Sequence, residues 1–70
     1  MTLILYNQHQ RTGAITCQRS HMATVAKQQL SSFEEVIALD GDEMVAQYRN
    51  VDGQPCKAVL KGGEETFVRL

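Results

Sequence analysis

The chain has 70 residues, of which 43% are hydrophobic, and its formal net charge at pH 7 is −1. A chain of this length closes around one apolar core, so we expect a single domain over residues 1–70 and no deep catalytic cleft. The near-neutral charge disfavours a strongly basic nucleic-acid binder. The apolar runs are too short for a signal peptide or a membrane span, so we expect a cytoplasmic protein with no membrane partner.

Two short runs near the N-terminus are typical of β-strands. Residues 2–6 are apolar and partly β-branched, and residues 14–19 alternate, with Ile15 and Cys17 on one side. The polar stretch 7–13 lies between them and ends at Gly13. We therefore predict a hairpin in which residues 7–13 form the loop.

The next segment has the spacing of an amphipathic helix. Ser20 is a suitable N-cap, because its hydroxyl can accept from backbone N–H groups of the first turn. The apolar residues at helical spacing are Met22, Val25, Ala26, Leu30 and Phe33. The opposite arc would face water and consists of His21, Thr24, Lys27 and Gln28.

Residues 33–39 leave two alternatives open. Ser32 and Glu35 match a capping box, which favours a helix. The short β-favouring run at 36–39, followed by Asp40 and Gly41, favours a strand that leads into a hairpin. We predict the strand, because the Asp-Gly turn lies where that hairpin needs it.

Two further hairpins are predicted in the C-terminal half. A three-residue loop at 51–53 sets Tyr48 opposite Cys56, whereas a two-residue loop sets it opposite Lys57; we predict the former because it keeps lysine off the apolar face. A turn at Gly62 and Gly63 sets Ala58 opposite Phe67. The predicted inner face consists of Met44, Ala46, Tyr48, Cys56, Ala58, Leu60 and Phe67.

These elements predict a small, β-rich α+β domain of order β-β-α-β-β-β-β. Its strands would form an antiparallel sheet or a partly open barrel with one packed helix. On the face opposite the predicted inner set, Val45, Val59 and Val68 would lie near one another. These valines are either covered by the N-terminal hairpin or exposed as a docking patch.

The potential metal ligands lack the spacing of a known metal site. His9, Cys17, His21 and Cys56 are the right residue types for zinc, but structural zinc sites present paired ligands a few residues apart. Two cysteines in a chain without an export signal are typical of reduced, packed thiols. We therefore predict no metal site and no disulfide.

Other short motifs also fail to match a catalytic or cofactor-binding pattern. The acids at 40, 42 and 43 are followed by Met44 and Val45, which an EF-hand loop does not tolerate. Gly62 and Gly63 follow Lys61 rather than precede it, so they do not form a phosphate loop. Because no orienting group can be named for Cys17 and His21, we predict a protein that is not an enzyme and has no cofactor.

The stretch 8–22 contains basic and polar residues and no acid. We expect it, together with the first helix turns, to form an exposed basic-polar surface that docks an acidic surface of a protein partner. The residues of this predicted surface are His9, Arg11, Gln18, Arg19, His21 and Lys27.

By elimination, the sequence favours a small regulatory or interaction module, an adaptor or inhibitor of the kind common in bacterial accessory and bacteriophage genomes. The alternative is a nucleic-acid-binding protein that uses the same basic N-terminal half, with Tyr6 and Tyr48 stacking on bases.

Overall fold

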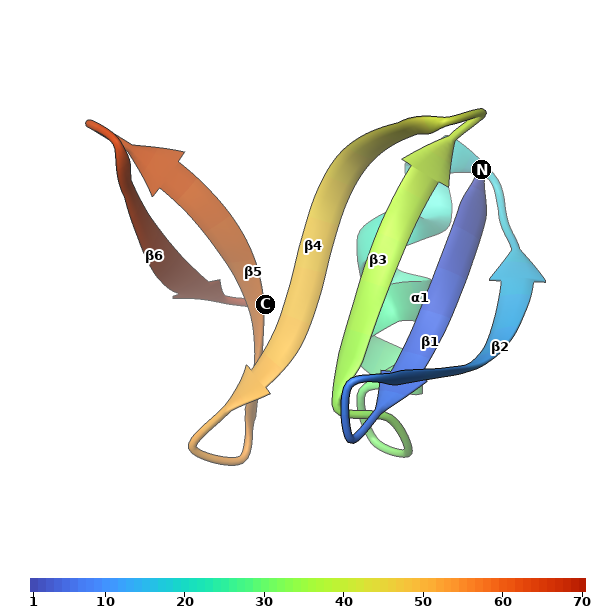
Figure 1. Cartoon of the computed structure of the whole chain (residues 1–70), viewed down its shortest axis with the longest axis horizontal. Helices are drawn as coiled ribbons and strands as arrows, with labels where there is room; N and C mark the ends of the chain where they lie inside the picture. Colours follow the sequence, from blue (N-terminus) through green and yellow to red (C-terminus); the bar gives the residue numbers. More distant parts are fainter.

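The computed structural model describes all 70 residues as one open, six-stranded antiparallel sheet with a short helix on one face (Figure 1). The sheet order is β2-β1-β3-β4-β5-β6, so β2 and β6 are its edges. In chain order the elements are β1 (Thr2–Asn7), β2 (Gln10–Thr16), the 3₁₀ turn η1 (Arg19–His21), α1 (Met22–Gln29), β3 (Glu35–Asp40), β4 (Glu43–Val51), β5 (Gln54–Lys61) and β6 (Glu64–Arg69).

The predicted element order and fold class are confirmed. Residues 35–40 form a strand rather than a helix, and β3 to β6 follow one another as a meander. Since β3 also pairs with β1, the helix crossover brings the N-terminal hairpin into the same sheet. Of the two architectures that the sequence left open, the sheet is the correct one, because β2 and β6 do not pair.

The core lies between α1 and the face of the sheet that it covers. Ala26 and Leu30 from the helix pack on buried residues of the sheet, which are Leu3, Leu5, Val36, Ala38, Ala46 and Tyr48. Met22, Val25 and Phe33 pack against this core at partial burial, which confirms the predicted apolar stripe. The charged and polar arc of the helix is exposed, also as expected.

The first hairpin has a tighter turn than the sequence predicts. Its loop consists of Gln8 and His9 alone, and Gly13 lies within β2, opposite Leu5. Gln8 and His9 both have a positive φ, of 53° and 63°, as a two-residue turn of this handedness requires. The prediction of a seven-residue loop was wrong because non-glycine residues rarely adopt this conformation, so the sequence does not mark the turn.

The helix begins later than predicted and without the expected cap. Ser20 lies in the 3₁₀ turn η1, and His21 is the residue that precedes α1. Neither Gln18 nor His21, at the two N-cap positions, makes a side-chain capping hydrogen bond. The prediction for Ser20 was wrong because the chain enters the helix through a tighter 3₁₀ turn, a common device at helix N-termini.

The hairpin between β4 and β5 adopts the register that sequence reasoning rejects. Tyr48 pairs with Lys57, and Asp52 and Gly53 form a two-residue loop with φ of 53° and 79°. Asp-Gly is among the preferred sequences for this type of turn. The prediction failed because it required regular pairing along both strands, whereas β4 has a register irregularity near Val45 and its ladder with β5 stops at Tyr48.

The predicted inner face is therefore only partly correct. Ala46 and Tyr48 are buried in the core, but Met44, Leu60 and Phe67 are 57%, 77% and 36% exposed. Cys56 is buried as expected, yet it pairs with Arg49 and so projects from the opposite face to Tyr48. Leu60 and Phe67 do not belong to the core, because the β5–β6 hairpin extends away from the helix as a separate arm (Figure 1). The register at the β5–β6 turn itself is confirmed, with Ala58 opposite Phe67.

Candidate interaction face

The face of the sheet opposite α1 is not covered by any element, and we call it the open face. Directly paired residues in an antiparallel ladder project from the same side, so the registers assign each side chain to a face. Leu3 and Leu5 project toward the helix, so Ile4 and Tyr6 project from the open face. Ile4 and Cys56 are the two buried residues outside the core cluster.

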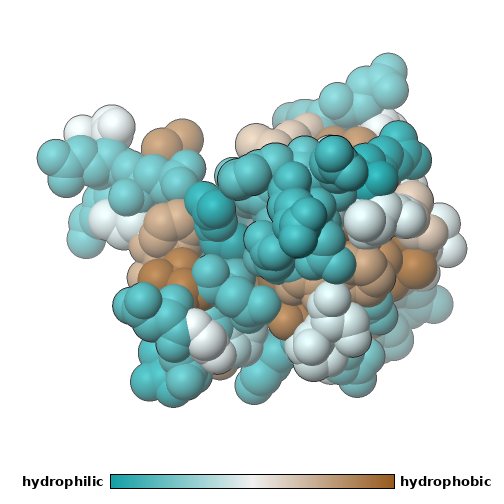
Figure 2. All heavy atoms as spheres, turned by 60° about the horizontal axis from the view of Figure 1, so that its bottom comes forward, coloured by the Kyte–Doolittle hydropathy of each residue, from teal (hydrophilic) through white to brown (hydrophobic).

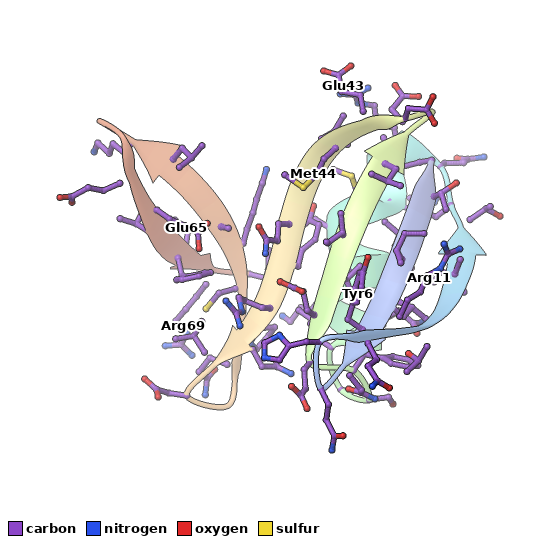
Figure 3. The ribbon with its side chains drawn as sticks, viewed as in Figure 1. Tyr6, Arg11, Glu43, Met44, Glu65 and Arg69 are labelled. Atoms are coloured by element: carbon purple, nitrogen blue, oxygen red, sulfur yellow. The ribbon has the colours of Figure 1, made fainter.

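One line of side chains crosses the whole open face from edge to edge. Its residues pair successively through all five ladders and are, from β2 to β6, Arg11, Tyr6, Glu35, Arg49, Cys56 and Arg69. We call this line the arginine row. Figure 3 shows Arg11, Tyr6 and Arg69 at a similar height across the sheet, with Tyr6 between the two arginines. Strand spacings of roughly 4.8 Å make the row at most about 24 Å long.

None of the three arginines in this row forms an ion pair. The single ion pair in the structure joins Arg19 and Asp40, with Nη1 and Oδ2 3.4 Å apart. Within the row, the Glu35 carboxylate accepts a hydrogen bond from Gln47, and Arg69 donates to the Gln54 side chain at 2.9 Å. The row therefore presents three guanidinium groups whose charge no carboxylate of the chain neutralises within contact distance.

A polar hollow of about 110 Å³ lies at the centre of the row. It is lined by Tyr6, His9, Glu34, Glu35, Arg49 and Asn50. Tyr6, Glu35 and Arg49 are half-buried here, whereas Arg11 and Arg69 at the ends of the row are exposed. The centre of the row is therefore less exposed to water than its two ends.

The structure separates the predicted site residues into two groups. Arg11 belongs to the arginine row, and His9 lines the hollow at its centre. Gln18, Arg19 and His21 follow the other end of β2, a strand of seven residues that spans about 20 Å. All of these side chains are exposed, as expected.

Lys27 lies on α1, on the opposite side of the sheet, and lines a second hollow with Leu30 and Gly53. Arg19 is partly neutralised by Asp40. Of the six predicted residues, therefore, only Arg11 lies in the arginine row and only His9 lines its central hollow.

Sequence reasoning missed Arg49 and Arg69. Their shared row with Arg11 depends on the registers of five ladders. The β1–β2 and β4–β5 registers among them were predicted wrongly. The Asp52-Gly53 turn signal could have identified them, because a two-residue loop sets Arg49 opposite Cys56.

Both cysteines are free thiols, and no three side chains of His, Cys, Asp or Glu gather into a group that could hold a metal ion. Tyr48, which the sequence suggested as a stacking residue, is fully buried, so that suggestion was wrong. Its hydroxyl has no hydrogen-bond partner. Burial raises the pKa of this hydroxyl, and the nearby Cys17 adds a smaller rise.

No protein family, curated protein or solved structure matches this chain. The helix of this fold is neither long nor apolar enough to cross a membrane.

Proposed function

We propose that the protein is a non-enzymatic interaction module, an adaptor or inhibitor that docks an acidic surface of a protein partner on its open face. The observation that carries the proposal is the arginine row, with three guanidinium groups free of ion pairs beside Tyr6. Arginine and tyrosine are enriched among the residues that dominate protein interfaces. A guanidinium group also binds a carboxylate through two parallel hydrogen bonds.

The charge of the surroundings favours an acidic protein over a nucleic acid. Glu34 and Glu35 line the hollow in the middle of the row, where a phosphate backbone would meet like charge. Three arginines would neutralise few phosphates, and the whole chain carries a net charge of −1. A partner that offers separate carboxylates, with hydrogen-bond donors between them, fits this alternation of charge better.

Nucleic-acid binding is the second candidate function, and Tyr6 is the observation that favours it. An aromatic side chain between arginines on an open sheet can stack on an unpaired base. The two candidates use the same row and differ in the ligand, so one titration separates them.

The test is a titration, followed by NMR of backbone amides, with a decapeptide of alternating glutamate and asparagine and with a thymidine dodecanucleotide as probes at low and moderate salt. We expect the decapeptide to shift amides in the arginine row and to bind more tightly than the oligonucleotide. Tighter, steeply salt-dependent binding of the oligonucleotide would establish the second candidate instead. Shifts confined to residues 18–28 would mean that the decapeptide binds at the part of the sequence-predicted surface that lies away from the arginine row.

A pair of charge-reversal variants completes the test. Arg11→Glu with Arg69→Glu alters the two exposed ends of the row, and we expect it to weaken decapeptide binding by at least about tenfold. Lys27→Glu with Lys61→Glu changes the net charge equally, but both lysines lie outside the row, so binding should change little. Equal losses in the two variants would mean that only net charge matters.

We further propose that the protein acts in the cytoplasm. Cys17 and Cys56 are both free, and their thiols suit a reducing compartment.

A further inference from the structure

Strands β4 and β5 pair along only part of their length. Their ladder runs from Val51–Gln54 to Tyr48–Lys57, and beyond it the two strands separate (Figure 1). We call this region the fork. In the fork, residues 43–47 of β4 pair only with β3, and residues 58–61 of β5 pair only with β6. The fork therefore contains two stretches of strand edge inside the sheet, where backbone groups lack a ladder partner.

The bend that opens the fork has a local cause. The ladder between β3 and β4 shifts register between Ala38 and Leu39, which leaves an extra residue in β4 near Val45. Such a bulge bends the strand that carries it and increases its twist. Thus β4 follows β3 toward the helix-covered body, while β5 continues into the arm.

An apolar groove of about 220 Å³ lies in the fork, between the separated parts of β4 and β5. Met44 and Val45 line it from β4, and Ala58, Val59 and Leu60 line it from β5. Met44 and Leu60 are the most exposed of the large hydrophobic residues in the chain. Figure 2 shows hydrophobic surface on the β5–β6 arm at the left, and also on the body of the molecule at the right. The volume is below the roughly 300–1,000 Å³ of small-molecule pockets, so the groove suits side chains of a polypeptide segment.

Acidic residues lie at the two strand ends nearest the groove, and we call these residues the rim. Asp42 and Glu43 lie where β4 begins, and Glu64 and Glu65 lie where β6 begins. None of these four carboxylates forms an ion pair. Glu65 also lines the groove, and Figure 3 shows Met44 and Glu65 on its two sides. Lys61 is the one basic residue in the adjoining β5–β6 turn region, so the rim is predominantly negative.

We propose that this groove binds an extended segment of a partner protein by strand addition, with apolar side chains at alternate positions and lysine or arginine at the flanks. Backbone hydrogen bonds to the free edge of β4 supply affinity, and the groove selects the apolar side chains that face it. The acidic rim selects the basic flanks. This site is separate from the arginine row, and the inference holds whether or not the proposed function of that row is correct.

The charge on the rim also argues against a second copy of this chain as the occupant. Of the two edge strands, β6 begins with two glutamates, which would meet the acidic rim of the other copy. The other edge strand, β2, uses Ile15 against its own core and carries one basic residue, Arg11. Self-association is nevertheless an outcome that the experiment measures.

The probe is a blocked peptide of sequence Lys-Lys-Val-Thr-Val-Thr-Val-Lys-Lys, titrated into the full chain and followed by NMR and amide hydrogen exchange. We expect shifts in residues 43–47 and 58–61 and slower exchange of amides on the β4 edge. Two control peptides, one with proline at the central valine and one with glutamate at all four flanking positions, should bind at least about tenfold more weakly. Equal binding of all three peptides, or no shift at millimolar peptide, would overturn the inference.

Matched variants locate the site. Met44→Lys with Leu60→Lys changes two exposed groove residues, and we expect at least about a tenfold loss of peptide binding with folding intact. Val68→Lys is the control, since Val68 is 54% exposed on β6 but does not line the groove. Equal effects of both changes would argue against the groove.

Two further experiments distinguish this inference from its alternatives. The Arg11→Glu, Arg69→Glu variant should bind the peptide normally, so a loss there would mean that the arginine row holds the peptide. Sedimentation of the unliganded protein should show a monomer. A dimer that Met44→Lys with Leu60→Lys dissociates would mean that a second copy occupies the groove.

Discussion

Arg49 and Phe67 contact each other across an intervening strand. The guanidinium carbon of Arg49 on β4 lies 5.9 Å from the centroid of the Phe67 ring on β6. The residues of β5 beside them are small, since Arg49 pairs with Cys56 and Phe67 pairs with Ala58. Two large side chains can therefore meet above β5 on the open face. This contact links the β5–β6 arm to the body of the sheet.

The first prediction concerns the strength of that contact. We expect Phe67→Ala to lower the free energy of unfolding by about 1 kcal/mol, because a cation–π pair at an exposed site contributes roughly 0.5–1 kcal/mol. Urea denaturation measures the loss, and Arg49→Gln should reproduce most of it. A loss of roughly 3 kcal/mol or more would show that Phe67 packs as a core residue after all.

The second prediction contrasts two leucines. Leu60 is 77% exposed and Leu30 is 4% exposed. We expect Leu60→Ala to change the free energy of unfolding by less than about 0.5 kcal/mol, whereas Leu30→Ala should cost about 2–5 kcal/mol. Equal losses for the two variants in the same denaturation experiment would contradict the arm's separation from the core.

The outcome for these side chains shows what the sequence can and cannot predict. Strand and helix positions follow from local periodicity, so the element order and the helix stripe from Met22 to Leu30 were predictable. The glycine pair at the β5–β6 turn likewise set the last register correctly. Leu60 was predicted to be a core residue only because it continues the alternation of apolar side chains along β5. Such alternation does not reveal where two strands separate.

The arginine row was unpredictable for a related reason. A one-residue error in register moves every side chain of a strand to the other face, so an error at the β4–β5 turn hides the relation between Arg49 and Arg69. Arg11 was identified from composition alone, as one residue of an acid-free stretch. Composition also grouped Arg11 with Arg19 and Lys27. In the structure Arg19 lies beyond the other end of β2, and Lys27 lies on the helix side of the sheet.

The third prediction tests the β1–β2 turn. Gln8 and His9 both adopt left-handed backbone conformations, which cost a non-glycine residue roughly 1–2 kcal/mol each. Replacing them together with Asn-Gly, the preferred pair for this turn, should raise the free energy of unfolding by about 1 kcal/mol. Gly53→Ala is a control with the opposite expected sign. Gly53 has a φ of 79°, so alanine at this position should lower the free energy of unfolding. A loss of stability from Asn-Gly would mean that Gln8 and His9 do not form this turn.

The fourth prediction concerns the connection between α1 and β3. The Asn50 side chain donates to the carbonyl oxygens of Leu30 at 2.8 Å and Phe33 at 3.2 Å, which ties this connection to β4. We expect Asn50→Ala to cost about 1–2 kcal/mol, because two hydrogen bonds are lost. Asn50→Asp should cost at least as much, since a carboxylate cannot donate to either carbonyl. Thermal unfolding of both variants checks this, and an unchanged midpoint in Asn50→Asp would contradict it.

The last prediction concerns the buried hydroxyl of Tyr48 and the alkaline limit of stability. The side chain is completely buried, and its hydroxyl finds no hydrogen-bond partner. An unsatisfied buried polar group costs roughly 1–3 kcal/mol, so Tyr48→Phe should be neutral or stabilising at pH 7.

The pH dependence of this effect follows from the raised pKa of Tyr48. Burial is the larger cause of the rise and Cys17 the smaller one. Because the folded-state pKa lies above the unfolded value of about 10, the hydroxyl is protonated in both states below that pH, and its ionisation does not affect stability there. As the pH rises from about 10 through the folded-state pKa, the unfolded chain releases the proton more readily, so the folded state loses stability relative to it. Wild-type stability should therefore fall more steeply above pH 10 than that of Tyr48→Phe. Denaturation curves at intervals from pH 8 to about pH 11 measure the difference. Parallel curves for wild type and Tyr48→Phe would show that the Tyr48 hydroxyl ionises as easily in the folded protein as in the unfolded chain.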